Sequence, residues 1–132
     1  MDSAAPPLAR ESYISLETFR KDGTGVKTPV WAAPLEGRLV VFSEGKSYKV
    51  KRVRNDPRVR VAACDVRGNV RGDWYDGTCR ILEDAGDVAR AHRALRDKYG
   101  VLAAMTDFFA WIAGRINKRA YLELTIDAAP KP

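Results

Sequence analysis

The sequence predicts a single, mainly β domain that folds as a closed or nearly closed antiparallel barrel with a few helices. The chain has 132 residues, a length typical of one domain. Five or six short stretches show the alternation or the β-branched composition of strands, and turn signals separate most of them. Closure into a barrel would remove the unpaired strand edges that small β domains otherwise expose.

Two strands joined by a tight hairpin begin the domain. Glu11–Arg20 alternates between two faces with the period of two that marks a strand. Lys21–Gly25 follows as a turn, because its glycines supply the positive φ that hairpins need. Val26–Leu35 is then the returning strand. Pro29 and Pro34 lack backbone donors, so we expect parts of this strand to lie at a sheet edge, a bulge or a ligand.

The remaining strands and the domain limits follow from the same patterns. Further strands are predicted at Leu39–Phe42, Val59–Asp65, Trp74–Leu82 and Ala120–Asp127. The predicted domain spans residues 11–127, with an N-terminal arm at 1–10 and a tail at 128–132. Cys64 and Cys79 lie within strands, and we expect both to be small buried hydrophobic residues rather than a reactive pair.

Three helices are predicted between the strands. A short basic helix begins after Ser47, a residue type that caps helices, and its Val50 and Val53 can face the core. Gly86–Lys98 is a second helix, and a third follows the break at Gly100. Along the third helix, apolar residues recur at helical spacing: Met105, Phe108, Phe109, Ile112 and Ile116. We expect this stripe to be core or a subunit interface, with a wall of a substrate pocket as the alternative.

The composition also bounds location and metal chemistry. No apolar stretch approaches the ~20 residues of a membrane span. Met1–Arg10 lacks the basic start and the apolar run of a signal peptide. We therefore expect a cytoplasmic protein without a membrane span. The single histidine, His92, excludes a His-rich metal cage, and we expect it to be a surface or packing residue.

The net positive charge of the chain is concentrated in residues 45–60. The formal net charge is +6, and this segment holds seven Lys and Arg residues against Asp56 alone. Such crowding indicates an anionic partner, with a solvated helix face as the alternative. Lys46 and Lys49 would oppose the dipole of the helix that begins after Ser47, and this conflict favours a phosphate ligand. Nucleic acid is not expected, because aromatic residues do not interleave with these cations.

Motifs for covalent or metal catalysis are missing from the sequence. There is no Gly-x-Ser-x-Gly elbow, no His-Glu-x-x-His, no phosphate-cradling Gly-x-x-x-x-Gly-Lys loop and no Cys-x-x-Cys. Catalytic residues therefore cannot be named. A phosphate site in a protein with few acid–base residues suits chemistry carried by a cofactor, for which the protein supplies a groove and orientation.

Four segments of the chain together carry a family resemblance: Thr18–Gly23, Lys27–Trp31, Gly45–Arg52 and Asn55–Val59. In this order and spacing they resemble the split-barrel flavin and deazaflavin oxidoreductases, which are relatives of pyridoxamine 5′-phosphate oxidase. The similarity runs from Glu11 to Ile126. The best fit is the small actinobacterial branch that uses the deazaflavin coenzyme F-420.

The resemblance implies a fold, a site and an activity. The fold would be an antiparallel, Greek-key-like FMN-binding split barrel that forms homodimers, with the cofactor ring in a groove between subunits. The residues beside the ring would be Thr28, Pro29, Val30 and Trp31. The cofactor phosphate would be bound by Ser47, Lys49 and Lys51, with Ser43, Lys46 and Arg52 as neighbours. The implied activity is hydride transfer from reduced coenzyme F-420 to an unsaturated or electron-poor small molecule.

Two alternatives remain open at this point. One is an FMN-dependent enzyme similar to pyridoxamine 5′-phosphate oxidase, although the chain is short for the oxidase that acts on pyridoxal vitamers. The other is a non-catalytic protein that binds the cofactor, haem or a bilin, for which His92 offers weak support.

Overall fold

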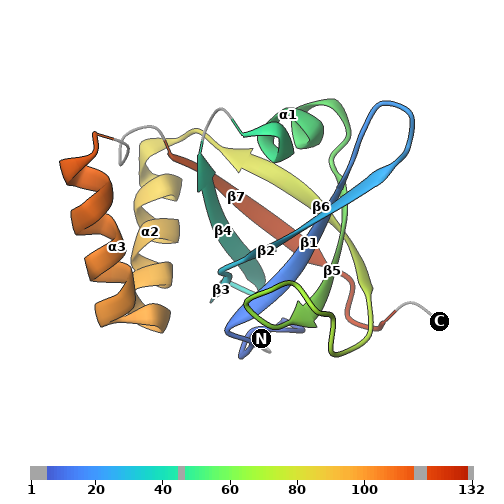
Figure 1. Cartoon of the computed structure of the whole chain (residues 1–132), viewed down its shortest axis with the longest axis horizontal. Helices are drawn as coiled ribbons and strands as arrows, with labels where there is room; N and C mark the ends of the chain where they lie inside the picture. The colour runs from blue at the N-terminus through green and yellow to red at the C-terminus, as the bar shows by residue number, and fades with distance from the viewer. Residues whose placement is uncertain (1–5, 45–46, 115–118, 131–132) are drawn as a thin grey trace.

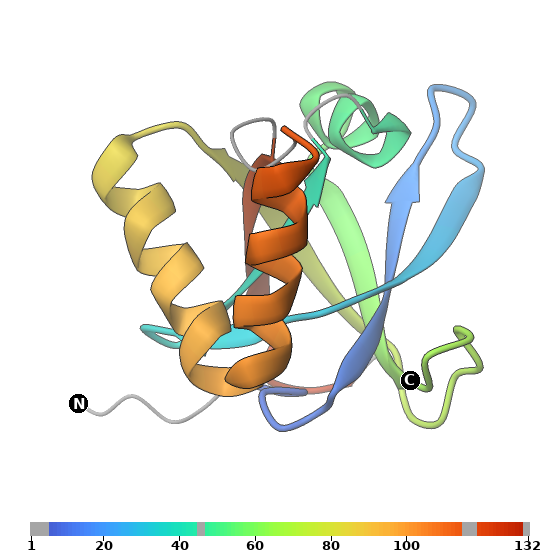
Figure 2. The ribbon, with the colours of Figure 1, turned by 60° about the vertical axis from the view of Figure 1, so that its left-hand side comes forward.

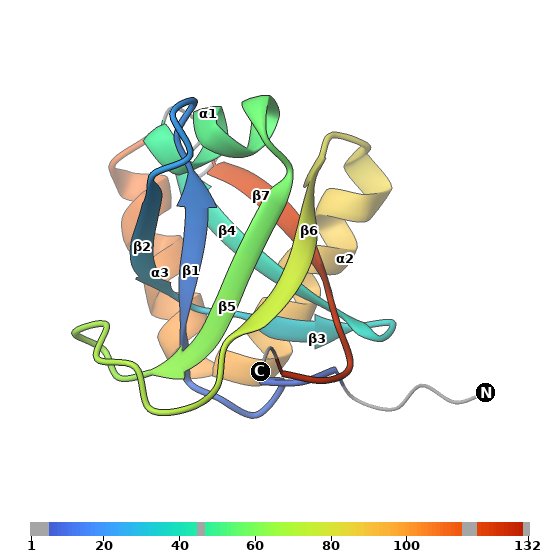
Figure 3. The same ribbon diagram turned by 90° about the vertical axis from the view of Figure 1, so that its right-hand side faces the viewer.

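The computed structural model describes residues 6–44, 47–114 and 119–130, which form one antiparallel sheet accompanied by three helices (Figure 1). The strands are β1 (Tyr13–Phe19), β2 (Gly25–Val30), β3 (Ala33–Leu35), β4 (Arg38–Glu44), β5 (Arg58–Cys64), β6 (Tyr75–Leu82) and β7 (Arg119–Ile126). The helices are α1 (Tyr48–Asn55), α2 (Ala85–Tyr99) and α3 (Val101–Ile112). Neighbouring strands follow the order β2-β1-β5-β6-β7-β4-β3. The sheet curls into a barrel (Figure 3), which confirms the predicted mainly β fold.

The two edge strands of the sheet, β2 and β3, follow one another in the chain. The prediction of one continuous strand over Val26–Leu35 is therefore wrong. The chain leaves the sheet at Trp31 and Ala32, because the end of α2 takes the hydrogen bonds of Ala32. The Ala32 N–H donates to the Tyr99 hydroxyl at 3.0 Å, and the Ala32 carbonyl accepts from Lys98 Nζ.

The prolines of this segment lie where the sequence prediction allows them. Pro29 is in β2 and Pro34 is in β3, and each strand has a partner on one side only. An edge strand tolerates a missing backbone donor. The expectation that part of this segment lies at an edge is confirmed.

Two hydrophobic clusters hold the fold together. The first fills the barrel and includes the fully buried Ile14, Leu16, Leu39, Val41, Val61, Leu122 and Leu124. The second joins the outer face of the sheet to α2 through Val40, Tyr121, Ala91 and Leu95. Alternation along β4 explains both, because Leu39 and Val41 face the interior whereas Val40 faces the helix.

Helix α1 lies across one end of the barrel (Figure 1). The side chain of Ser47 accepts a hydrogen bond from the Val50 N–H at 3.4 Å, so the predicted N-cap is confirmed. Val50 and Val53 are buried, as their spacing predicts, and Val53 joins the barrel cluster. The carbonyl of Arg52 accepts the N–H of Asp56, and the helix ends before Pro57.

Helices α2 and α3 run side by side on the flank of the barrel (Figure 2). Ala91 and Leu95 of α2 are buried, as predicted, but the buried residues of α3 are Ala103 and Ala110. The predicted stripe of α3 faces outward: Met105, Phe108, Phe109 and Ile112 are all exposed. The interpretation of this stripe as core is therefore wrong for these four residues, and Ile116 lies outside the described residues.

No described helix has the length and apolar character needed to cross a membrane. Cys64 and Cys79 are both buried and free, as expected. Burial raises the pKa of the Cys79 thiol to about 12, so this thiol stays protonated at neutral pH.

Candidate cofactor site

A basic cleft lies between strand β2 and helix α1. Its volume is about 540 Å³, and its lining residues are Arg20, Val26, Thr28, Ser47, Tyr48, Lys49 and Arg52. Three of these residues are cationic, and none of the seven is acidic. We call this the phosphate cleft, since three cations facing one cavity attract a multiply charged anion.

The side chains of Ser43, Ser47 and Lys49 form a hydrogen-bonded network where the phosphate cleft is lined by Ser47 and Lys49. The Ser43 and Ser47 hydroxyl oxygens are 3.0 Å apart, and Lys49 Nζ donates to the Ser43 hydroxyl at 3.2 Å. Ser47 also caps α1, so its position is fixed by the backbone as well as by Ser43. These donors are held in place before any ligand arrives, which lowers the entropy cost of binding one.

Arg52 is held in place by a hydrogen bond and lies near a second positive charge, that of Arg20. Arg52 Nε donates to the buried Thr18 hydroxyl at 2.6 Å, which fixes the guanidinium beside the cleft. Burial, together with the positive charge of Arg20, lowers the pKa of Arg52. An anion between the two guanidinium groups would relieve this repulsion. The donor set therefore fits a phosphate group, whose oxygens accept hydrogen bonds from Arg, Lys and hydroxyl groups.

A second, more apolar groove adjoins the phosphate cleft. Its volume is about 330 Å³, and it is lined by Tyr13, Pro29, Val30, Trp31, Phe42, Ser43, Lys49 and Thr106. Lys49 belongs to both cavities, so the two are contiguous. We call this the ring groove, because its aromatic and aliphatic walls with a few hydroxyl groups suit a flat heterocycle.

The position of Trp31 in the ring groove is fixed by other aromatic rings. The Tyr99 ring is stacked on the indole, with ring centroids 4.4 Å apart and planes 8° from parallel. Phe42 packs edge-on against the same indole at 6.2 Å. Trp31 is thus part of a rigid wall rather than a mobile side chain.

The structure brings most of the predicted site residues together. Thr28, Ser47, Lys49 and Arg52 line the phosphate cleft, and Pro29, Val30, Trp31 and Ser43 line the ring groove. Lys51 instead borders a neighbouring pocket of about 220 Å³ together with Phe19, Arg20, Lys21, Tyr48, Arg52 and Asn55. Lys46 lies outside the described residues.

Sequence reasoning missed several residues of the site, notably Arg20, Phe42, Tyr13 and Thr106. Arg20 directly follows β1 at the start of the hairpin that leads into β2. This position next to the predicted ring strand would have been enough to predict it as a site residue. Phe42 lies on the face of β4 opposite to Val41, beside Trp31, which alternation along the strand also predicts. Thr106 had no sequence signal, because its place depends on how α3 packs.

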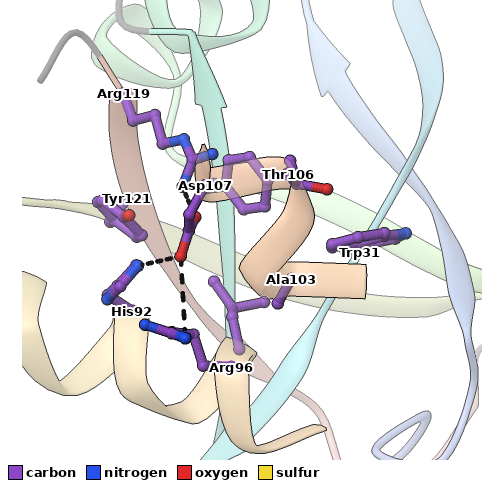
Figure 4. A pocket seen from close by; sticks show the side chains of 10 residues that line it. Trp31, His92, Arg96, Ala103, Thr106, Asp107, Arg119 and Tyr121 are labelled. Atoms are coloured by element: carbon purple, nitrogen blue, oxygen red, sulfur yellow. Dashed lines mark hydrogen bonds and ion pairs between the residues drawn. The ribbon is translucent and has the colours of Figure 1, made fainter. Parts of the chain in front are cut away.

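A charged cluster lines a small pocket together with Trp31 and Phe42, and Figure 4 shows its Asp107 between Arg119 and His92. Asp107 of α3 accepts from Arg119 Nη1 at 2.6 Å, and its other oxygen is 2.8 Å from His92 Nε2. Burial opposes ionisation of Asp107, but these hydrogen bonds outweigh it and lower the pKa of the carboxyl. The cavity enclosed here is only about 10 Å³, room for about one water molecule.

Within the described residues, no group of three or more His, Cys, Asp and Glu side chains is arranged to hold a metal ion. His92, the only histidine of the chain, is engaged with Asp107 and faces a water-sized cavity.

An antiparallel barrel with this strand order, and with a basic cleft beside an apolar groove, is a split-barrel protein. The sequence pattern of the pyridoxamine 5′-phosphate oxidase family matches residues 2–129, and the chain belongs to that family. No curated protein sequence matches this chain.

Solved structures share the fold at low sequence identity. An FAD-binding protein from Mesorhizobium loti is 24% identical, with a TM-score of 0.58 over 91% of this chain and 82% of that one. An F420 reductase is 19% identical, with a TM-score of 0.62 over 92% of this chain and 91% of that one. HutZ, the haem storage protein of Vibrio cholerae, is 9% identical, with a TM-score of 0.67 over 90% and 84%. At these identities the likeness shows the fold.

Proposed function

We propose that the protein is a coenzyme F-420-dependent oxidoreductase of the cytoplasm that acts on an unsaturated or electron-poor small organic molecule. The observation that carries the proposal is the contiguity of the phosphate cleft and the ring groove through Lys49. A phosphorylated flavin-like molecule needs both features, a cationic seat at one end and a flat apolar slot at the other.

The residues of the chain have separate roles in this proposal. Ser47, Lys49 and Arg52 would hold the phosphate, with Thr28 at the wall of the cleft and Ser43 supporting Lys49. Pro29, Val30 and Trp31 would lie against the ring and exclude water from one side of it. Hydride chemistry is what the bound, reduced deazaflavin supplies. The protein contributes orientation and a dry surface for the acceptor.

The neighbouring pocket favours a deazaflavin over FMN. It shares Arg20, Tyr48 and Arg52 with the phosphate cleft and adds Lys21 and Lys51, and no acidic residue lines it. FMN ends at its phosphate, whereas coenzyme F-420 continues into an acidic tail. In this proposal Lys51 binds that acidic tail rather than the phosphate.

Fluorescence titration of the purified protein with coenzyme F-420 and with FMN tests the proposal. We expect saturable, tight binding of coenzyme F-420 and much weaker binding of FMN. The reduced coenzyme should then be oxidised when electron-poor acceptors are added to the complex. Preferential binding of FMN would replace the proposal with the FMN-dependent enzyme. Tight binding without turnover of any acceptor would leave a non-catalytic cofactor-binding protein.

Haem binding through His92 is disfavoured by the geometry. The Nε2 atom of His92 is 2.8 Å from the carboxylate of Asp107, and the adjoining cavity is water-sized. A haem ligated by this nitrogen would have to break that bond and displace α3.

A further inference from the structure

Thr18 of β1 is a buried polar residue whose side chain is bonded to a cation of the phosphate cleft. It lies on the same side of the strand as the core residues Ile14 and Leu16, and it is only 1% exposed. Its hydroxyl accepts a hydrogen bond from Arg52 Nε at 2.6 Å. A buried hydroxyl is costly unless it is bonded, so this contact is what the barrel gains from a threonine here.

The hydrogen bond to Thr18 leaves the outer end of the Arg52 guanidinium available. A guanidinium has N–H donors on Nε, Nη1 and Nη2, and Thr18 uses Nε. Within residues 6–44, 47–114 and 119–130, the Arg52 side chain makes no other hydrogen bond and no salt bridge. Arg52 lines the phosphate cleft, so its Nη1 and Nη2 groups are the donors that a ligand there can use.

Arg20 brings a second guanidinium to the same cleft. It follows β1 directly, two residues after Thr18, and it lines both the phosphate cleft and the neighbouring pocket together with Arg52. Burial and the charge of Arg20 both lower the pKa of Arg52. Neither guanidinium forms a salt bridge with a carboxylate of the described residues. Two like charges on one cavity favour an anion that carries more than one negative charge.

We propose that Thr18 is a positioning residue of the phosphate cleft. By accepting the hydrogen bond of Arg52 Nε it turns Nη1 and Nη2 toward the cleft, so that Arg52 and Arg20 bind one phosphate group together. Thr18 acts through Arg52, since it is not among the residues that line the cleft. The inference rests on the proposed function for the phosphate alone, and it does not depend on the cofactor ring or on the reaction.

Fixing Arg52 before the ligand arrives should raise the affinity for phosphate. A free arginine side chain loses rotamer freedom when it binds an anion, and this loss weakens binding. Here Thr18 holds Arg52 from the side of the barrel, and the buried Val53 packs the next residue of α1 into the barrel cluster. Backbone and side chain of Arg52 are therefore both ordered in the free protein.

Calorimetry with two ligands separates positioning from a general structural role. One ligand is the deazaflavin that ends in a phosphate, and the other is the matching deazaflavin that ends in a free hydroxyl. Thr18→Val keeps the branched shape but has no acceptor. We expect it to weaken binding of the first ligand by about tenfold, the scale of one hydrogen bond to a charged group, and to leave the second unchanged. Thr18→Ser keeps the hydroxyl and should restore the difference. Ser15→Ala is the matched control, since Ser15 lies on the same strand, is also 1% exposed and lines neither cleft.

Nuclear magnetic resonance of the wild type covers the case in which Thr18→Val does not fold. The Nε–H signal of Arg52, assigned by its loss in Arg52→Lys, should be protected from exchange in the free protein and should shift when inorganic phosphate is added. An unprotected or unshifted signal overturns the proposal, as does a Thr18→Val variant that weakens both deazaflavins equally or neither. A signal that shifts with phosphate in a protein that binds no deazaflavin would keep the role of Thr18 and overturn only the proposed function.

Discussion

The ring of Tyr99 lies flat on the indole of Trp31, with ring centroids 4.4 Å apart. The Tyr99 hydroxyl also accepts the N–H of Ala32 at 3.0 Å and donates to the Ser12 carbonyl at 2.8 Å. One residue at the end of α2 thus fixes both the break between β2 and β3 and the wall of the ring groove. Helix α2 therefore contacts the candidate site directly, through the stacking of Tyr99 on Trp31.

Replacing Tyr99 with Phe separates the hydroxyl from the stacking. We expect Tyr99→Phe to lower the free energy of unfolding by about 1–3 kcal/mol, because the fully buried N–H of Ala32 loses its acceptor. Trp31 should keep its place, so cofactor affinity should stay at the wild-type value. Urea unfolding gives the stability, and Tyr99→Leu, which also loses the stacked ring, is the comparison expected to weaken cofactor binding as well.

The same tyrosine predicts a loss of stability at high pH. Burial is the main cause that raises the pKa of Tyr99 to about 12, from the ordinary value of 10.0. The folded state therefore holds this proton at pH values where the unfolded chain releases it. The stabilisation is complete below about pH 10 and is lost as pH rises toward 12. The difference in stability between wild type and Tyr99→Phe should shrink over that range, and a constant difference would contradict the assignment.

Lys49 is the cation common to both cavities, so its removal should affect cofactor binding most directly. We expect Lys49→Ala to weaken binding of coenzyme F-420 by about 1.5–3 kcal/mol, the scale of a charge-assisted hydrogen bond. Lys51→Ala, two residues further along the same helix, is the matched control and should have a smaller effect, because Lys51 lines only the neighbouring pocket. Isothermal titration calorimetry measures both. Equal losses would contradict the separate roles given to the two lysines.

Asp107 should stabilise the fold at neutral pH and less in acid. Its pKa is lowered on balance, since hydrogen bonds from Arg119 and His92 outweigh the effect of burial. The contribution is present above the ordinary value of 3.8 and is lost as pH falls through the lower value in the folded state. Asp107→Asn should cost about 1–3 kcal/mol at pH 7, and the difference from wild type should narrow as pH falls below the ordinary value of 3.8. Denaturant unfolding at several pH values checks this.

Gly77 allows β6 to pass close to β7. A Cβ atom at this position would lie 2.5 Å from the Thr125 carbonyl oxygen and 2.9 Å from Ile126 Cδ1. Gly77→Ala should therefore destabilise the barrel by about 1–3 kcal/mol through overpacking. At Gly72 the nearest atom would be 3.8 Å away, and Gly72→Ala should be close to neutral. The thermal unfolding midpoints of the two variants are compared. A lower midpoint for Gly77→Ala alone shows a steric clash, whereas equal decreases in both variants would contradict this explanation.

The sequence predicted features that depend on neighbouring residues in the chain. The N-cap Ser47 and the buried pair Val50 and Val53 follow from spacing within one helix, and the structure confirms them. The alternation along β1 likewise predicts that Ile14 and Leu16 share one face, and both side chains lie in the barrel cluster. These signals are local, so a single sequence contains them in full.

Features that depend on distant residues were missed. The break at Ala32 is produced by Lys98 and Tyr99, more than sixty residues later in the chain. The direction of α3 is set by Asp107, which bonds residues of α2 and β7. Periodicity identifies the apolar side of a helix but does not show whether that side meets the core or a partner.

The central claim is that the phosphate cleft binds the phosphate of a flavin-like cofactor, and a binding cycle tests it most directly. Calorimetry would compare the deazaflavin that ends in a phosphate, without the acidic tail of coenzyme F-420, with the matching deazaflavin that ends in a free hydroxyl, for the wild type and for Lys49→Ala. We predict that removing the phosphate weakens binding to the wild type by at least tenfold, about 1.4 kcal/mol, and that much of this difference disappears in Lys49→Ala. Equal affinities of the wild type for the two molecules, or no heat with either, would contradict the account.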